Sequence, residues 1–234
     1  MLLGLTACAR QGLADAELKA QRLYQLLNAL YVEKRSLFVR HNLQPLRRDF
    51  VSFGAMVYFL KSWAEYAAAF DDEGARRTFR VAAQNLMVRQ LDDGGWPWFY
   101  HVPSGKVMDV YEVYSVHQDS MAMLFLFPAR DLGVEGIDEV TRRSVQWLYG
   151  CNDLQQSMLR NEPFFIHRSI RRRVGATRAR RFARATAHGL LGREATQIDA
   201  DRLEINRECR SYHIGWLLYA WADQADADAW FTPD

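Results

Sequence analysis

Three segments of this chain are apolar on every side of a helix, and they restrict its fold more than any other feature. They are residues 49–70, 119–131 and 212–222, the last reading YHIGWLLYAWA. A helix that is apolar all round is usually buried on both faces. Between and before these segments, the spacing of apolar residues predicts amphipathic helices over 13–32, 75–90 and 138–149.

Buried helices that alternate with half-exposed ones predict an all-α protein whose helical hairpins stand in a ring, an α/α toroid. In such a ring, every connection from an outer helix to an inner helix emerges at the same end. Here those connections are 31–48, 91–117 and 151–209, the longest in the chain, and we expect them to meet. The chain, 1–234, would then be a single domain and a partial ring, which a second copy or a partner chain could complete.

The composition is that of an ordinary globular protein, with 49% hydrophobic and 25% charged residues. A net charge of +2 gives no indication of a nucleic-acid partner. Three widely spaced cysteines make neither a disulfide framework nor a zinc site, which favours a cytoplasmic location. The segment Leu5–Cys8 is similar to the end of a lipoprotein signal, but neither a basic region nor a long apolar run precedes it. No apolar run reaches the length of a membrane span.

Residues 90–123 concentrate aromatic and titratable side chains in a stretch that glycine and proline interrupt. Such a segment indicates a binding surface, although an ordered loop closing the end of the ring would have the same composition. Tyr111, Tyr114 and His117 share a face if the next helix begins early. We expect Tyr114 and His117 to transfer a proton beside a uronate carboxylate, unless they simply pack at the helix entrance.

A matching group precedes the last apolar helix. It contains Glu208, Arg210, Tyr212 and His213. We expect Glu208, Tyr212 and His213 to act with Asp119 in catalysis, and Arg210 to hold a carboxylate or phosphate unless it forms a salt bridge with Glu208 or Asp119.

A second assignment of the carboxylates remains open, since Glu112 and Asp119 could be the acid pair of a glycosidase. The predicted substrate-binding residues are Trp96, Trp98, Tyr100, Tyr111, Glu112, Gln118 and Arg210. The aromatic members offer flat faces suited to sugar rings or prenyl chains, but Trp96 could equally belong to a plug at the mouth of the ring.

Ten arginines and a single acid, Glu162, lie between residues 160 and 193. This bias predicts either a solvated, mobile insertion or a site for a polyanion such as an acidic polysaccharide, pyrophosphate, RNA or an anionic lipid. His41, His101, His167 and His188 lack the spacing of metal ligands, so we expect no metal site and no cofactor.

The spacing Leu-x3-Gln-x3-Gly-x-Trp begins at Leu86 and ends at Trp96. It resembles the core of the QW repeat of terpenoid cyclases and protein prenyltransferases, which are α/α toroids. The resemblance implies that Gln90 ties a helix end to the next turn while Trp96 packs below it. A weaker second copy is visible at Leu148, Asn152 and Gln156.

The catalytic motifs of those enzymes do not match this chain. Asp226-Ala-Asp228 replaces the Asp-x-Asp-Asp acid of triterpene cyclases, and Asn152, Ser157 and Glu162 are out of register for a metal-binding triad. Other toroids act on sugars, namely six-hairpin glycosidases, polysaccharide lyases and the helical domains of glucuronyl C5-epimerases. The stretches 111–119 and 207–213 are similar in character to their Tyr/His sites.

The function we predict is therefore a carbohydrate-active protein that transfers protons through tyrosine and histidine, as a lyase, epimerase or hydrolase on an acidic sugar. One alternative is a terpenoid-cyclase-like protein that binds a prenyl pyrophosphate in a pocket walled by Phe53, Tyr58, Trp63 and Phe125. The other alternative is a non-catalytic scaffold or assembly module.

Overall fold

The computed structural model describes residues 1–32, 38–40, 47–174 and 178–231. Its helices are α1 (Leu2–Arg10), α2 (Ala16–Asn28), α3 (Phe53–Phe70), α4 (Glu73–Met87), the π-helix η1 (His117–Met121), α5 (Met123–Asp131), α6 (Ile137–Tyr149), α7 (Arg178–Leu190), the 3-10 helix η2 (Ala200–Arg202), α8 (Ser211–Trp221) and α9 (Ala227–Trp230). The helices predicted from the sequence are confirmed to within a few residues. His41, one of the histidines considered as a metal ligand, lies outside the described residues.

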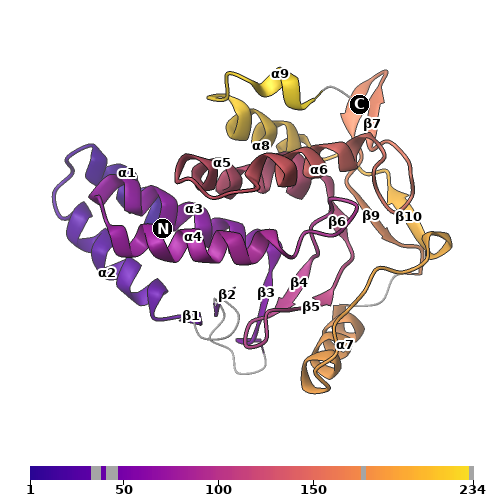
Figure 1. Cartoon of the computed structure of the whole chain (residues 1–234), viewed down its shortest axis with the longest axis horizontal. Coiled ribbons are helices and arrows are strands. Elements are labelled where there is room, and N and C mark those ends of the chain that lie inside the picture. The colour runs from indigo at the N-terminus through magenta and orange to yellow at the C-terminus, as the bar shows by residue number, and fades with distance from the viewer. Residues whose placement is uncertain (33–37, 41–46, 175–177, 232–234) are drawn as a thin grey trace.

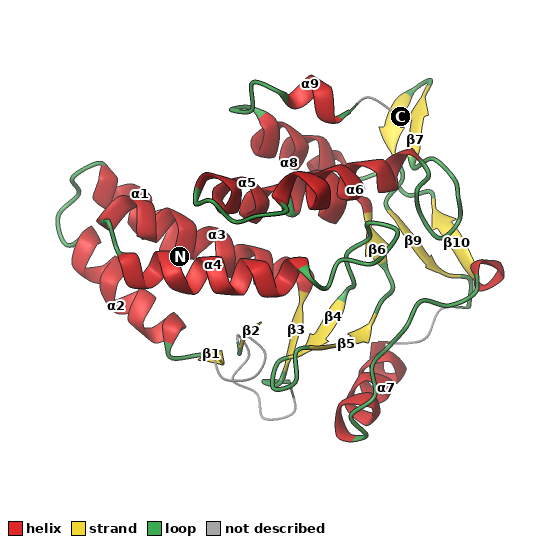
Figure 2. Cartoon of the chain, viewed as in Figure 1, coloured by secondary structure: helices red, strands yellow, loops and turns green. Residues whose placement is uncertain are grey.

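The prediction of an all-α toroid is wrong, because the long connections form antiparallel sheets (Figure 2). The strands are β1 (Tyr31–Val32), β2 (Phe38–Val39), β3 (Phe50–Ser52), β4 (Phe99–His101), β5 (Lys106–Asp109), β6 (Val113–Tyr114), β7 (Leu159–Asn161), β8 (Phe164–Ile166), β9 (Ser169–Arg172) and β10 (Leu203–Asn206). None of them exceeds four residues, so none is long enough to show the alternation by which a strand is predicted. The protein is a mixed α/β structure.

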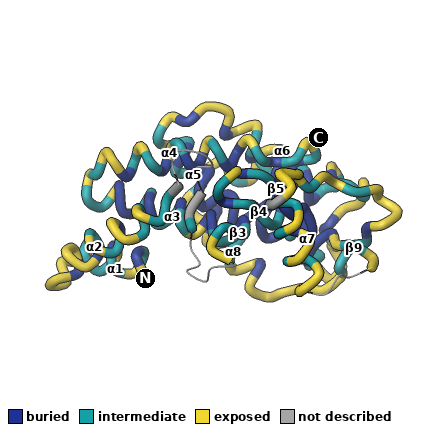
Figure 3. Tube along the Cα trace, turned by 90° about the horizontal axis from the view of Figure 1, so that it is seen from below, coloured by how far each residue is buried: buried dark blue, intermediate teal, exposed yellow. Residues whose placement is uncertain are grey.

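Two three-stranded sheets organise the connections, in the orders β3-β4-β5 and β10-β9-β6. The helices pack beside them, with α3 at the centre of the helical layer, against α1, α4 and α5 (Figure 1). Buried residues are concentrated where these helices and the first sheet face each other (Figure 3). The largest fully buried side chains there include Trp63, Trp96, Trp147 and Phe53.

Local sequence explains where the central helices begin. The Ser52 hydroxyl accepts a hydrogen bond from the Ala55 amide at 3.3 Å, and the Asp72 carboxylate accepts one from the Ala75 amide at 2.8 Å. These N-caps satisfy backbone donors that the first helical turn leaves unpaired. Each lies directly ahead of its helix, so Ser52 and Asp72 fix the entry points of α3 and α4.

The turns after α4 and α6 are held in the same way. The Gln90 side-chain amide donates to the carbonyl oxygens of Gly94 and Val140, both at 3.0 Å. The Asn152 amide donates to the carbonyl oxygen of Gln156 at 2.8 Å, again four residues along. The hydrogen bond expected of Gln90 is confirmed, and Asn152 makes a similar bond in the turn after α6.

The last apolar helix differs from its prediction. It forms α8 as expected, but Ile214, Leu218 and Tyr219 on it are exposed, so it is not buried on both faces in this chain.

The segment Leu5–Cys8, which is similar to the end of a lipoprotein signal, lies within helix α1. Among the described residues, no helix combines the length and the apolar character that crossing a bilayer requires.

Candidate functional site

The connections 91–117 and 151–209 meet through paired strands. Val113 and Tyr114 of β6 pair with Ile170 and Ser169 of β9. The Ser115 amide then donates to the Arg168 carbonyl oxygen at 2.9 Å. This pairing brings Tyr114, at the entrance of the η1–α5 helical segment, beside residues more than fifty positions later in the chain. Two of the three connections expected to converge therefore meet, while most of the third, 31–48, lies outside the described residues.

His117 lies at the start of η1 inside a cage of aromatic rings. Its ring stacks on Trp98 with centroids 5.9 Å apart, and the rings of Tyr114 and Phe53 lie at 5.2 and 4.8 Å. Burial, with a smaller effect of the nearby His213, lowers the pKa of His117 to about 3. His117 is therefore a neutral imidazole near pH 7, and it supports Trp98 and Tyr114 from beneath.

Asp119 and His213 form a buried pair next to this cage. The Nε2 atom of His213 lies 2.8 and 2.9 Å from the two oxygens of the Asp119 carboxylate. The Ser120 hydroxyl donates to the same carboxylate at 2.6 Å, and the Trp221 indole donates to the Asp119 carbonyl oxygen. His117 and His213, both predicted as catalytic residues, thus lie in one cluster. Within it, the Asp119–His213 pair holds α8 against η1.

Charged groups lie around Tyr114 at the edge of the cage. The Arg168 guanidinium lies over the Tyr114 ring, 5.5 Å from its centroid, and pairs with Glu208. Arg210 pairs with the other oxygen of Glu208, which is the salt bridge that the sequence left as an alternative. The hydrogen bond from Arg168 is the main reason that the pKa of Glu208 is lowered.

Glu112 is the second carboxylate near Tyr114. It accepts a hydrogen bond from the Ser169 hydroxyl at 3.0 Å and is partly exposed. Burial chiefly, and then the Glu112 charge, raise the pKa of Tyr114, so its phenol carries a proton at neutral pH. Tyr114 and Trp98 are both half-buried, unlike the fully buried Trp96 and Tyr100.

Several predicted substrate-binding residues lie in the interior. Trp96 is fully buried and donates to the Ser144 hydroxyl at 2.9 Å, while Tyr100 is fully buried as well. Gln118 is fully buried and donates to the Tyr114 carbonyl oxygen at 3.1 Å. Tyr111 is also buried, and its hydroxyl donates to Asp153 at 2.9 Å. These residues support the site, whereas Tyr212 is 49% exposed at the start of α8.

The arginine-rich segment 160–193 contains β7, β8, β9 and α7. Three of its arginines converge on the carboxylate of Asp109, which is only 3% exposed: Arg172 at 2.7 Å, Arg184 at 3.1 Å and Arg181 at 3.2 Å. These contacts fix α7 to the end of β5. Arg168 and Ser169 were not predicted from the sequence. Arg168 is one of ten arginines between residues 160 and 193, and only the pairing of β9 with β6 places it beside Tyr114.

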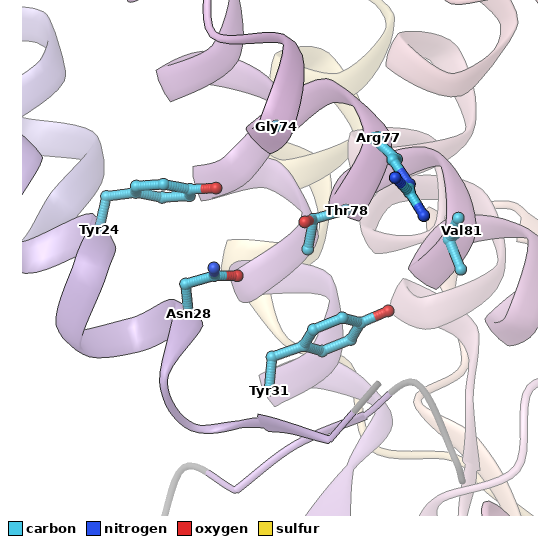
Figure 4. Close-up of a pocket in the computed structure, with 7 residues that line it drawn as sticks. All are labelled: Tyr24, Asn28, Tyr31, Gly74, Arg77, Thr78 and Val81. Carbon is cyan, nitrogen blue, oxygen red and sulfur yellow. The ribbon is translucent and has the colours of Figure 1, made fainter. Parts of the chain in front are cut away.

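A pocket of about 310 Å³ lies away from this cluster, between α2 and α4 (Figure 4). It shares no residue with the His117 cage, so the two are separate features. Of the four predicted walls of a terpenoid pocket, Phe53, Trp63 and Phe125 are fully buried in the core, whereas Tyr58 is 45% exposed. Among the described residues, no cluster of His, Cys, Asp or Glu has the geometry to hold a metal ion, and the expected lack of a metal stays a prediction.

No protein-family model, curated protein or solved structure matches this chain. The resemblance to QW-repeat proteins therefore rests on sequence spacing alone and stays a prediction. The function of this chain is therefore inferred from the arrangement of Trp98, Tyr114 and Arg168.

Proposed function

We propose that this protein binds an acidic sugar and transfers a proton at the carbon next to its carboxylate. The observation that carries the proposal is the placement of Arg168 over Tyr114, with Trp98 beside the same ring. Half-exposed aromatic rings with a guanidinium at their edge suit a sugar ring that bears a carboxylate.

The charge around the site supports an anionic substrate. Ion pairs within the described part of the chain join Arg168, Arg172, Arg181, Arg184 and Arg210 to Asp109, Glu112 and Glu208. Five arginines thus share three acids, which leaves an excess of positive charge. Much of the arginine-rich segment is occupied by these pairs, so we propose the site near Tyr114, rather than α7 alone, as the place where an anion binds.

The roles follow from exposure and protonation. The Glu112 carboxylate acts as the base and takes the proton from the carbon next to the uronate carboxylate. The electron pair moves into that carboxylate, whose charge Arg168 neutralises. The protonated Tyr114 phenol returns a proton, either to the opposite face of the carbon or to the departing glycosidic oxygen. These two outcomes correspond to an epimerase and a lyase.

The remaining predicted catalytic residues act at a distance from the substrate. His117, Asp119 and His213 are each less than 5% exposed, so they serve as positioning residues beneath Tyr114. Glu208 holds Arg168 and Arg210, and Tyr212 lies exposed at the start of α8. Phe53, an expected wall of a prenyl pocket, instead packs against Trp96 and Phe125 in the core.

The test is incubation of the protein with uronate oligosaccharides in D2O. We expect deuterium to enter the sugar at the carbon next to the carboxylate, or an unsaturated product to form, and Glu112→Gln and Tyr114→Phe to abolish the reaction. The variant Glu204→Gln, which alters an exposed ion pair on β10, serves as the matched control. Absence of both deuterium and unsaturated product with every uronate tested would overturn the proposal.

A further inference from the structure

The pocket between α2 and α4 has two distinct walls. Figure 4 shows Tyr24, Asn28 and Tyr31 extending from one wall toward α4, which carries Arg77 and Thr78 on the other. Its volume of about 310 Å³ is at the lower end of the range for small-molecule sites. A ligand of monosaccharide size would fill it.

The aromatic side chains of the pocket are held from behind. Tyr24 stacks on Tyr66 with ring centroids 4.2 Å apart, and Tyr31 meets Trp63 edge-on at 5.3 Å. Tyr66 and Trp63 both belong to the buried face of α3. The pocket walls are thus fixed before any ligand binds, which lowers the entropic cost of binding.

Among the described residues, two polar groups of the pocket have no partner: a hydrogen-bond acceptor on Asn28 and the guanidinium of Arg77. The Asn28 side-chain oxygen is buried and has no hydrogen-bond partner among the described residues. Arg77 forms no ion pair within that part of the chain, whereas Arg76 and Arg80 on the same helix both pair with Glu73. A buried acceptor without a donor costs free energy, so a ligand hydroxyl at Asn28 would be favourable.

The acids next to the pocket have partners other than Arg77 among the described residues. Burial raises the pKa of Tyr24 to about 12, so its hydroxyl is neutral and bonds with Thr78. The acid before α4, Asp72, contributes to the raised pKa of Tyr24 and uses its carboxylate to cap the helix at the Ala75 amide. The acid in the first turn of α4, Glu73, pairs with Arg76 and Arg80. Because both carboxylates already have partners, the Arg77 guanidinium at the pocket edge favours an anionic ligand group.

From this geometry we infer that the pocket binds a small hydroxylated anion of monosaccharide size, whose phosphate or carboxylate pairs with Arg77 and whose hydroxyl donates to Asn28. The inference does not depend on the proposed reaction at Tyr114. It assigns the α2–α4 face a ligand of its own.

Calorimetric titration with glucose 6-phosphate, glucuronate and neutral glucose tests this inference. We expect at least one of the two anions to bind saturably, and glucose to bind at least about tenfold more weakly. The variant Arg77→Gln should weaken binding of the anion at least about tenfold, whereas Arg80→Gln, one turn away on α4, should leave it within about twofold.

Two further variants make the result decisive. Asn28→Asp places a negative charge in the pocket and should also abolish binding of glucose 6-phosphate, whereas Arg168→Gln, at the separate Tyr114 site, should leave binding of glucose 6-phosphate unchanged. Loss in Arg168→Gln with retention in Arg77→Gln would assign the anion to the Tyr114 site and overturn the inference. No saturable binding of either anion would overturn it as well.

Discussion

His213 binds both oxygens of the Asp119 carboxylate, at 2.8 and 2.9 Å, across 94 residues of sequence. The pair joins the first turn of α8 to η1, and both side chains are at most 5% exposed. Breaking a buried pair by removing one partner leaves the other partner's polar group unsatisfied. Asp119 therefore determines whether α8 stays packed against η1.

We predict that Asp119→Ala lowers the free energy of unfolding by about 3–5 kcal/mol. Urea denaturation measures the loss. The matched control is Glu204→Ala, which removes an exposed ion pair with Arg171 and should cost less than about 1 kcal/mol. Equal losses in the two variants would show that the Asp119–His213 pair does not hold α8.

Acid should destabilise the protein through His117. Its pKa is lowered from 6.5 to about 3 in the folded state, so the unfolded chain binds the proton first as pH falls. The stability contribution is present above the unfolded pKa and is lost as pH falls toward the folded value, by about 2 kcal/mol between pH 7 and pH 5. We expect His117→Gln to flatten this part of the stability profile; an unchanged slope would show that His117 is not buried as a neutral ring.

Asp153 should have the opposite pH dependence. Burial, followed by the charge of Asp93, raises its pKa from 3.8 to about 6. Its contribution is therefore present below the unfolded pKa and is lost as pH rises through about 6. We predict that Asp153→Asn stabilises the protein at pH 8 by about 1–2 kcal/mol after allowance for solvent screening, and by less near pH 4. Thermal unfolding at the two pH values checks the sign, and a greater gain at pH 4 would contradict it.

Gly94 should tolerate no side chain. Its φ is +90°, and a Cβ atom there would lie 2.1 Å from the Arg143 carbonyl oxygen. We predict that Gly94→Ala costs at least about 2–3 kcal/mol, from both the strained backbone and the overlap. Gly133 has a φ of +73° with nothing within 4 Å, so Gly133→Ala, at about 1 kcal/mol, isolates the backbone term. Similar costs for both variants would show that the turn after α4 can open.

The longer helices could be predicted because each has a repeated apolar pattern over many residues, as in α3 and α4, whereas α1 and the four-residue α9 were not expected. The strands could not, because β6 has two residues and is recognised only through its pairing with β9. Arg168 could not be predicted for the same reason, because only this pairing places it beside Tyr114. Trp96 and Tyr100 were predicted to face a ligand, yet their rings lie in the core, since composition alone does not show which side of a connection faces inward.

The most direct test of the proposed function is a calorimetric titration of a short uronate oligosaccharide into the protein and two arginine variants. Arg168→Gln removes the guanidinium over Tyr114, and Arg171→Gln removes an exposed arginine of β9 that pairs with Glu204. We predict saturable binding to the wild type, a loss of at least about tenfold in Arg168→Gln, and little change in Arg171→Gln. No binding by the wild type, or equal binding by Arg168→Gln, would contradict the proposal that this protein holds an acidic sugar at Tyr114.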